Sequence, residues 1–199
     1  FVFAGGGQNE LTSIWKVTSS SSVNKISTDA IDGAIQKFNR EEIASSFAFD
    51  YSQDGAFFVA FTFESERIPS KTFVYDATAS AKSQMHVWHE QQSGVDDNRR
   101  RINSVTRAFG KLLVGDQMGG NIGELDINTY DEYGETFIWD WYSSPFQQDG
   151  LTFFNSDLEL FMEAGAGLAN GLGSDPKVSY TRSDQGGPFS NATTRTYGK

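Results

Sequence analysis

The sequence predicts an all-β protein, a β-propeller with four-stranded blades. Aromatic residues are plentiful (17 Phe, 7 Tyr and 4 Trp) and alternate with polar residues in short runs bounded by turn residues. Similar pairs of strands recur near Trp15, Val74 and Leu125, at a spacing of roughly 50–60 residues that is close to the period of propeller blades. Helical spacing is rare. These observations favour a propeller, and a β-sandwich with long loops is the alternative.

The clearest hairpin is "FAFDYSQDGAFFVAFTF". Aromatic residues alternate over 47–51, and apolar residues alternate again over 57–63. Between these runs, Asp54-Gly55 is a pair that accepts the left-handed backbone of a tight β-turn. The pattern therefore predicts two adjacent antiparallel strands.

Grouping the remaining strands gives a set of blades. One blade is predicted at 43–51, 56–63, 72–76 and 84–89, with a longer polar connection between its last two strands. The next is predicted at 102–109, 111–116, 121–127 and 136–143. Residues 1–27 hold most of an earlier blade, and 152–183 begin a later one. Residues 1–199 then form one β-propeller region of about four blades. Because the alternation starts at the first residue, we expect a piece of a longer chain.

One segment has helical spacing. Ile31, Ile35 and Phe38 recur at i, i+4 and i+7 after Thr28 or Asp29, either of which is a good N-cap. This predicts a short helix, with a single turn or a loop as the alternative.

Composition excludes several classes of function. The 26 acidic and 16 basic residues give a net charge of −10, which disfavours wrapping a phosphate backbone but allows DNA to pass an acidic wall. There is no cysteine, so disulfides, thiolate metal sites and cysteine nucleophiles are excluded. No apolar run approaches the ~20 residues of a membrane span.

The stretch "YTRSDQGGPFSN", residues 180–191, resembles the aspartate-box turn of sialidases and other propellers. With Ser183 in the leading position, Gly187 fits, Gln185 replaces the aspartate, and Asp184 lies one residue away. Even an intact box is a structural turn on the outside of a blade, because its carboxylate serves the turn's own amides. The motif therefore predicts a turn.

A sialidase also needs clustered arginines and a Tyr–Glu pair. Tyr180 and Glu163 are available, and so are the arginines at 40, 67, 107, 182 and 195, but their spacing selects no triad. A propeller glycosidase or a carbohydrate-binding propeller is the alternative function.

Two further motifs carry little chemistry. His86 and His89 would point to opposite faces of a strand, so they do not share a metal. The glycine-rich stretch 165–178 lacks the strand and helix of a dinucleotide site and reads as a protruding loop that meets a partner. The sequence predicts no metal and no cofactor.

The densest charge cluster is "DDNRRR", residues 96–101. Two acids followed by Arg99, Arg100 and Arg101 predict a self-neutralising, solvated connection between blades. The alternative is an interface, at which arginine is enriched. For the aromatic run "WDWY" at 139–142, the core is favoured over an interface.

Four stretches carry a resemblance to a known family: "FAFDYSQDGAFFVAFTF", "TFVYDATASAKSQMHVWHE", "FGKLLVGDQMGGNIGELDINTYDEYGE" and "LELFMEAGAGLANGLGSDPKVSYTRSDQGGPFSN". The chain resembles the packaged-DNA stabilisation protein, or tail hub (tail accessory factor, nozzle), of short-tailed podoviruses of the Salmonella-infecting lambdoid type.

The resemblance implies a non-catalytic virion protein that needs no cofactor and assembles as a ring below the portal adaptor. Such a hub retains packaged DNA and carries the tail spikes or needle. It is a tail protein of the virion that passes through the host cytoplasm during assembly. DNA passes its channel without sequence-specific binding.

The positions that match the family's motifs are read as structural turns, in which the glycines relieve positive-φ strain. They are Gly115, Asp116, Gly123, Asp126, Asp175, Pro176, Ser183, Asp184, Gly186 and Gly187. Arg99, Arg100 and Arg101 are candidate interface residues, and we expect their joint replacement by Ala to leave the fold intact.

Overall fold

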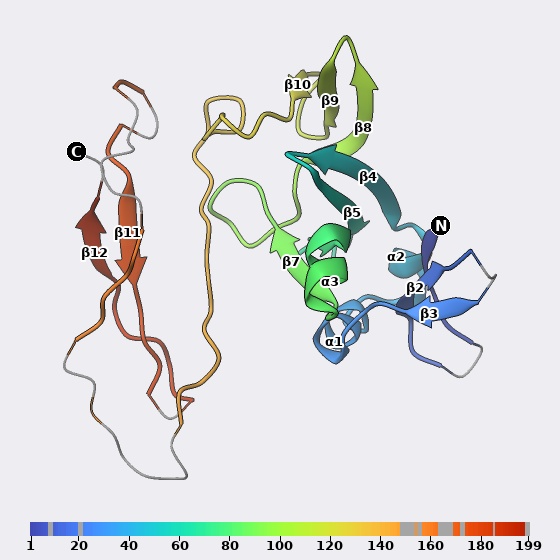
Figure 1. Ribbon diagram of the computed structural model, residues 1–199, viewed down its shortest axis with the longest axis horizontal. Coiled ribbons are helices and arrows are strands. Elements are labelled where there is room, and N and C mark those ends of the chain that lie inside the picture. Colours follow the sequence, from blue (N-terminus) through green and yellow to red (C-terminus); the bar gives the residue numbers. More distant parts are fainter. Residues whose placement is uncertain are drawn as a thin grey trace. The chain divides into compact units, whose positions relative to one another are not determined.

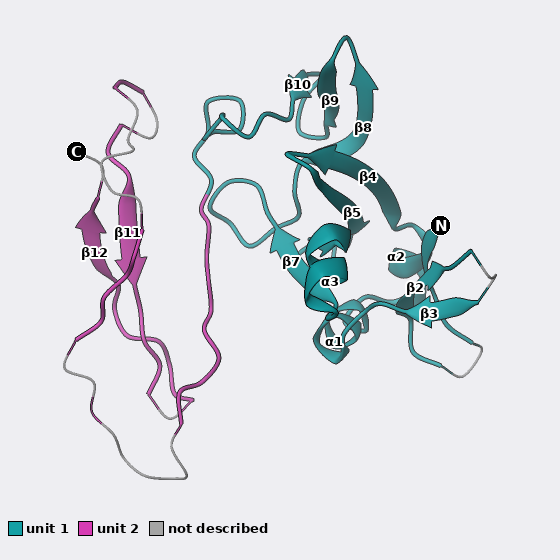
Figure 2. Cartoon of the chain, viewed as in Figure 1, with its two compact units in different colours: residues 1–137 teal, residues 138–199 magenta. Residues whose placement is uncertain are grey.

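The structure of the protein is a computed structural model. It describes residues 1–7, 10–19, 22–147, 154, 157–162, 169–171, 174–184 and 186–197. The chain forms two compact units, Phe1–Phe137 and Ile138–Lys199 (Figure 2). Among the described residues, no helix combines the length and the apolar composition needed to cross a bilayer.

The first unit contains three antiparallel sheets within its described residues (Figure 1). Strands β1 (Val2–Gly5), β2 (Ser13–Val17) and β3 (Val23–Lys25) form the first sheet. Strands β4 (Phe47–Gln53), β5 (Ala56–Phe63), β6 (Lys71–Asp76) and β7 (Val87–Gln91) form the second. Strands β8 (Ile102–Ala108), β9 (Lys111–Asp116) and β10 (Ile122–Glu124) form the third. In each sheet, neighbouring strands are consecutive in the chain, as in propeller blades.

The second sheet confirms the predicted four-stranded blade. β4 and β5 pair in register from Phe47↔Thr62 to Gln53↔Ala56, and the turn residues Asp54 and Gly55 have φ values of 48° and 76°. This is the left-handed geometry that twists with the two strands.

The predicted starts of the first and last strands of that blade are wrong, because capping residues favour a helix before each of them. Helix α2 (Arg40–Ala44) occupies the expected start of β4, with Asn39 and Glu42 closing a capping box. Helix α3 (Ala77–Ser83) fills the stretch read as a polar connection, and the Asp76 carboxylate accepts a hydrogen bond from Ala79 N at 2.7 Å. β7 consequently starts at Val87 and not at residue 84.

The predicted short helix is confirmed as α1 (Asp29–Ile35). Thr28 is its N-cap, and the Thr28 hydroxyl accepts from Ile31 N at 3.4 Å. Ile31, Ile35 and Phe38 are buried, so the apolar spacing faces the core as expected.

The main core lies where the first sheet, α1 and one face of the second sheet meet. Its buried residues come from β2, α1, β5, β6 and the adjoining loops: Ile14, Ile26, Ile31, Ile35, Phe38, Val59, Phe61, Phe63, Phe73 and Tyr75. Trp88 of β7 packs against them and donates from Nε1 to Ile26 O at 2.8 Å. This core fixes the second sheet against the first, since each large apolar side chain contributes roughly 1.5–3 kcal/mol on burial.

The third sheet differs from the predicted blade. Its third strand is limited to residues 122–124, and 136–143 form no strand. Phe137, Trp139 and Trp141 alternate as in a strand, but the segment pairs with no strand among the described residues and β10 remains the edge of its sheet. The favoured core position of the "WDWY" run is also wrong, because Trp139 and Trp141 are 84% and 73% exposed.

In the second unit, β11 (Lys177–Tyr180) pairs with β12 (Thr193–Thr196) as an antiparallel hairpin. The blade expected over 152–183 shows β11 and, in the described parts of 154–176, no strand. Residues 152–153, 155–156, 163–168 and 172–173 lie outside the described residues.

Candidate functional site

The loop 96–101 between β7 and β8 is exposed at Asp96, Asp97 and Asn98, whereas its arginines turn inward. Arg99 and Arg101 are 6% and 8% exposed, and Asp97 forms an ion pair with Lys71 and not with the arginines. The expected solvated connection is therefore confirmed for 96–98 and wrong for the arginines, and the expectation that the loop neutralises itself is wrong. The charges are satisfied by residues far away in sequence, and we call Arg99, Arg100 and Arg101 with these partners the arginine junction.

Arg99 ties the loop to the second sheet. Its Nη2 lies 2.9 Å from Glu64 Oε1, and its guanidinium lies 5.4 Å from the centre of the Phe47 ring. Burial lowers the pKa of Arg99, and the neighbouring Glu64 charge opposes that shift. Arginine remains charged in proteins, so Glu64 and the aromatic face together replace the water that Arg99 has lost.

Arg101 forms the centre of the junction. Its Nε and Nη2 donate to Asp116 Oδ1 and Oδ2 at 2.7 and 2.8 Å, a two-pronged pair. Its guanidinium also lies 4.6 Å from the Tyr133 ring centre and 3.4 Å from Glu135 Oε2. Hydrogen bonds from Arg101 lower the pKa of Asp116 to about 2. Asp116, expected as a turn residue, is therefore one partner of a buried ion pair.

Arg100 joins the second sheet to the segment that follows β10. Its backbone N donates to Thr72 Oγ1 at 3.2 Å, and its Nη1 donates to Gln91 Oε1 at 2.5 Å, so it contacts β6 and β7. Its Nε lies 3.6 Å from Glu132 Oε1, beyond the third sheet in sequence. The junction holds the second and third sheets in one orientation, and these charges are paired with each other. We now expect replacement of all three arginines by Ala to disturb the fold, while an interface role for them stays a prediction.

Two motif glycines are required for space and not for positive φ. A Cβ on Gly115 would lie 2.5 Å from Ser104 Oγ, and one on Gly123 would lie 2.4 Å from Tyr133 Oη. Neither residue has positive φ, so the expected strain relief is wrong for both. Gly123 leaves the space in which Tyr133 reaches Arg101.

Three other motif positions also lie in turns or at strand ends. Asp126 Oδ1 accepts from Asn128 N at 3.0 Å, which closes a side-chain turn. Asp175 pairs with Lys177 at 3.4 Å. Pro176 O accepts from Tyr197 N at 3.1 Å and extends the β11–β12 ladder.

The box-like stretch forms a hairpin turn. Ser183 and Phe189 form a bridge, and the Ser183 hydroxyl donates to Gly187 O at 2.5 Å. Gly187 N donates to Asp184 O at 3.0 Å, and Gly186 has φ of 73°, the geometry expected of a turn glycine. Gly187 does not have positive φ.

The residues named for sugar cleavage have other local contacts. Arg67 pairs with Glu42 at 3.1 Å, Arg107 donates to Ser52 O at 3.2 Å, and Arg182 lies 3.5 Å from Asp184. Arg195 and Tyr180 lie in β12 and β11, and Glu163 lies outside the described residues.

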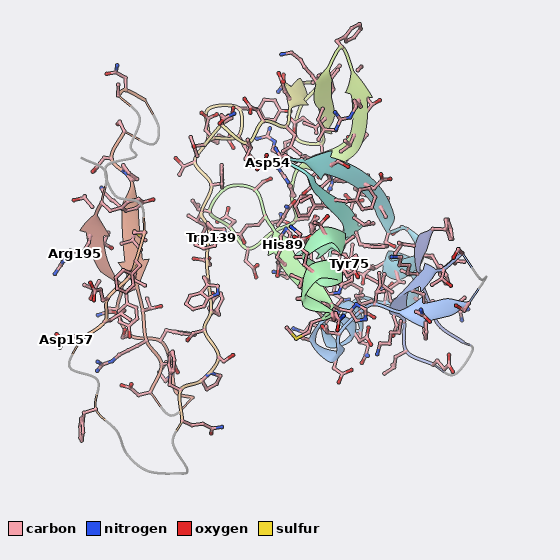
Figure 3. The ribbon with its side chains drawn as sticks, viewed as in Figure 1. Asp54, Tyr75, His89, Trp139, Asp157 and Arg195 are labelled. Carbon is pink, nitrogen blue, oxygen red and sulfur yellow. The ribbon has the colours of Figure 1, made fainter. Side chains whose placement is uncertain are left out.

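The two histidines contact different residues. His86 Nδ1 lies 3.4 Å from Tyr75 Oη, and His89 Nε2 lies 3.1 Å from Gln91 Nε2. Tyr75 and His89 are labelled in Figure 3. Burial lowers the pKa of His89. In the part of the chain that the structure describes, no group of three or more His, Asp and Glu side chains is placed to hold a metal.

One feature escaped sequence reasoning. The β8–β9 turn carries Phe109, which has φ of 54° and is 94% exposed. The sequence indicates this turn through the pair Phe109-Gly110, which occupies the two turn positions that normally carry Asn-Gly or Asp-Gly in a tight hairpin.

The comparison with known families agrees with this architecture. The model of the family described as bacteriophage P22 Gp10, beta-propeller, matches residues 1–130, which include all three sheets of the first unit. A search of the curated proteins found no match. Since the family model covers more than half of the chain, this protein belongs to that family of packaged-DNA stabilisation proteins, the β-propeller structural proteins of phages.

Proposed function

We propose that the chain is part of a phage tail hub, assembled as a ring of identical copies below the portal adaptor. There it retains packaged DNA and provides attachment for the tail spikes or needle. The observation that carries this proposal is the family match, which spans the three sheets of the first unit. The role is structural and uses neither catalysis nor a cofactor, and its place is the virion tail, reached through the host cytoplasm during assembly.

The physical chemistry of the chain supports this role. The apolar core and the arginine junction hold the three sheets of the first unit together, so little ordering entropy is lost when its loops meet neighbours. The net charge of −10 disfavours tight binding of DNA. DNA can therefore move through the channel without sequence-specific contacts.

The test is the mass of the full-length gene product, measured by light scattering alone and after mixing with the portal–adaptor complex. We expect a ring that joins the complex. Particles complemented with the gene should keep their DNA resistant to nuclease, and particles without it should lose that protection. A monomer that ignores the portal complex would contradict the proposal.

A parallel assay addresses the alternative function. We expect the full-length protein to leave a fluorogenic sialoside intact and to bind no glycan on an array. Turnover that is lost in Tyr180→Phe would favour a sialidase-like enzyme. Glycan binding by a stable monomer would favour a carbohydrate-binding propeller.

A further inference from the structure

The glycine-rich stretch 165–178 contains a dipeptide with a chemistry of its own, Asn170-Gly171. Among the asparagines of the sequence, only Asn170 is followed by glycine. Because glycine has no Cβ, its backbone nitrogen is the one that a neighbouring side chain approaches with the least obstruction. The pair therefore places a side-chain amide next to an accessible backbone nitrogen.

The structure leaves both groups of this pair accessible. Asn170 and Gly171 are exposed and lie outside any helix or strand, ahead of β11. Gly171 has φ of 83°, and its carbonyl oxygen accepts a hydrogen bond from Ser174 N at 3.2 Å. Among the described residues, none accepts a hydrogen bond from Gly171 N or from the Asn170 side chain. Within the described part of the chain, neither group is therefore held in another contact.

Two acidic residues of the first unit are also followed by glycine, at 32–33 in α1 and at 54–55 in the β4–β5 turn. The Asp32 carboxylate is held in a buried ion pair, 2.6 Å from Lys25 Nζ. The 54–55 turn is closed on both sides by the ladder of β4 and β5. In both pairs the backbone belongs to a hydrogen-bonded element and resists bending toward the side chain. Asn170 lies under no such constraint in the described residues.

We propose that Asn170 is a site of spontaneous deamidation, at which the chain modifies itself with water as the co-reactant. Gly171 N loses its proton and attacks Asn170 Cγ. The new N–Cγ bond closes a five-membered succinimide ring, and the Cγ–Nδ2 bond breaks to release ammonia. Water then opens the ring at either of its carbonyls. Opening at Cγ leaves aspartate, and opening at the backbone carbonyl leaves isoaspartate, in which the main chain runs through the former side chain.

The conversion changes the charge and the backbone of this stretch. Each event adds one negative charge to a chain whose net charge is −10. The new carboxylate lies within 112–176, which contains neither Lys nor Arg, so a part of the chain without cations becomes more acidic. Isoaspartate also inserts a methylene group into the main chain between Asn170 and β11. Aged protein is therefore a mixture of forms that differ in charge and in backbone length.

The test follows the full-length protein as it ages in heavy-oxygen water at neutral and at mildly alkaline pH. Peptide mapping by mass spectrometry should find Asn170 converted to both aspartate and isoaspartate, with heavy oxygen incorporated in each. Conversion should be faster at the higher pH, because Gly171 N must lose its proton before it attacks. The internal control is Asn191, which is also exposed but precedes Ala192, and it should convert at least about tenfold more slowly. Equal rates at the two asparagines, or aspartate without isoaspartate, would overturn the inference.

Two variants test the ring-closing step itself. Asn170→Gln lengthens the side chain, so that closure would need a six-membered ring, and conversion at this position should fall below detection. Gly171→Ala places a Cβ beside the attacking nitrogen and should slow conversion about tenfold, although this Cβ would meet no described atom within 4 Å. Melting temperatures equal to that of wild type would show that both variants fold. A wild-type rate in either variant would contradict the proposal.

A synthetic peptide of residues 165–178 gives the rate of conversion without the rest of the chain. The folded protein should convert within about tenfold of that rate, because an exposed segment outside the helices and strands opens at little cost. A larger retardation in the folded protein would show that Asn170 is protected, and the inference would fall. The reaction needs only the chain and water, so its failure would leave the proposed function intact, and a chain that forms no ring should still convert.

Discussion

The second sheet of the first unit is fixed to its two neighbours by opposite means. Toward the first sheet and α1 it presents Phe61, Phe63 and Phe73, which are buried among Ile14 and Ile35. Toward the third sheet the contacts are hydrogen bonds and ion pairs of the arginine junction. The apolar contact involves no ionised group, so the stability that it supplies does not depend on pH. The hydrogen bonds and ion pairs of the arginine junction form only when donors and acceptors are correctly placed. They therefore set the orientation of the third sheet.

The largest effect is expected on the apolar side. Phe63→Ala removes a fully buried ring from the core and should lower the free energy of unfolding by about 3–5 kcal/mol. Urea denaturation followed by tryptophan fluorescence measures it. Phe57→Ala, on the same strand but 40% exposed, is the matched control. Equal losses for the two variants would contradict the described core.

On the polar side, Arg101→Met should cost about 3 kcal/mol, because it leaves Asp116 buried without its cation. The double variant with Asp116→Asn should recover part of this loss. Arg67→Met is the control, since its pair with Glu42 is half exposed and should contribute under about 1 kcal/mol. A loss in Arg101→Met no larger than in the control would show that the junction is not buried in solution.

Replacing glycines by valine tests whether the space beside the arginine junction is needed. Gly123→Val should cost about 1–3 kcal/mol, because its Cβ would displace the Tyr133 ring from Arg101. Gly120→Val is the control, since a Cβ there meets no atom within 4 Å. Gly187→Val should have an intermediate effect, because its Cβ would lie 3.1 Å from Asp184 O. Thermal melting that ranks the variants differently would contradict this account.

The smallest expected effect is a loss of stability that occurs only at acidic pH. Asp116 has its pKa lowered from 3.8 to about 2 in the folded chain, so the stability from its charge is complete above the unfolded pKa. That stability is lost as the pH falls from about 4 toward 2. Asp116→Asn should flatten this part of the profile and leave the slope above pH 5 unchanged. Melting temperatures at half-unit steps from pH 6 to pH 2 would show an identical acid slope in both proteins if the assignment is wrong.

The elements that the sequence predicted correctly are those specified by residues close together in the chain. The hairpin 47–63 and the helix after Thr28 follow from alternation, spacing and caps that lie within a few residues of each other. Helix α3 also had local signals, an Asp76 cap and a run rich in alanine, but the polar residues among them suggested a loop. The signals for α3 were therefore present in the sequence, and the prediction of a loop gave them too little weight.

The arginine junction was beyond reach of the sequence for a different reason. Arg101 meets Asp116 and Glu135, which are 15 and 34 residues away, and nothing in the run of three arginines selects these partners. Phe109 shows a third case. Its turn was foreseeable from the Gly that follows, whereas its exposure depends on how far the hairpin projects.

The consecutive order of strands within each sheet has a consequence for how the protein is made. Each sheet of the first unit pairs only strands that are neighbours in the chain, so it can form as soon as its own segment leaves the ribosome. The second sheet is complete once residue 91 has emerged. Arg101 meets Asp116 15 residues after its own synthesis, but Glu135 only after 34 residues. The pairs with Glu132 and Glu135 are therefore the last ion pairs of the arginine junction that can form during synthesis.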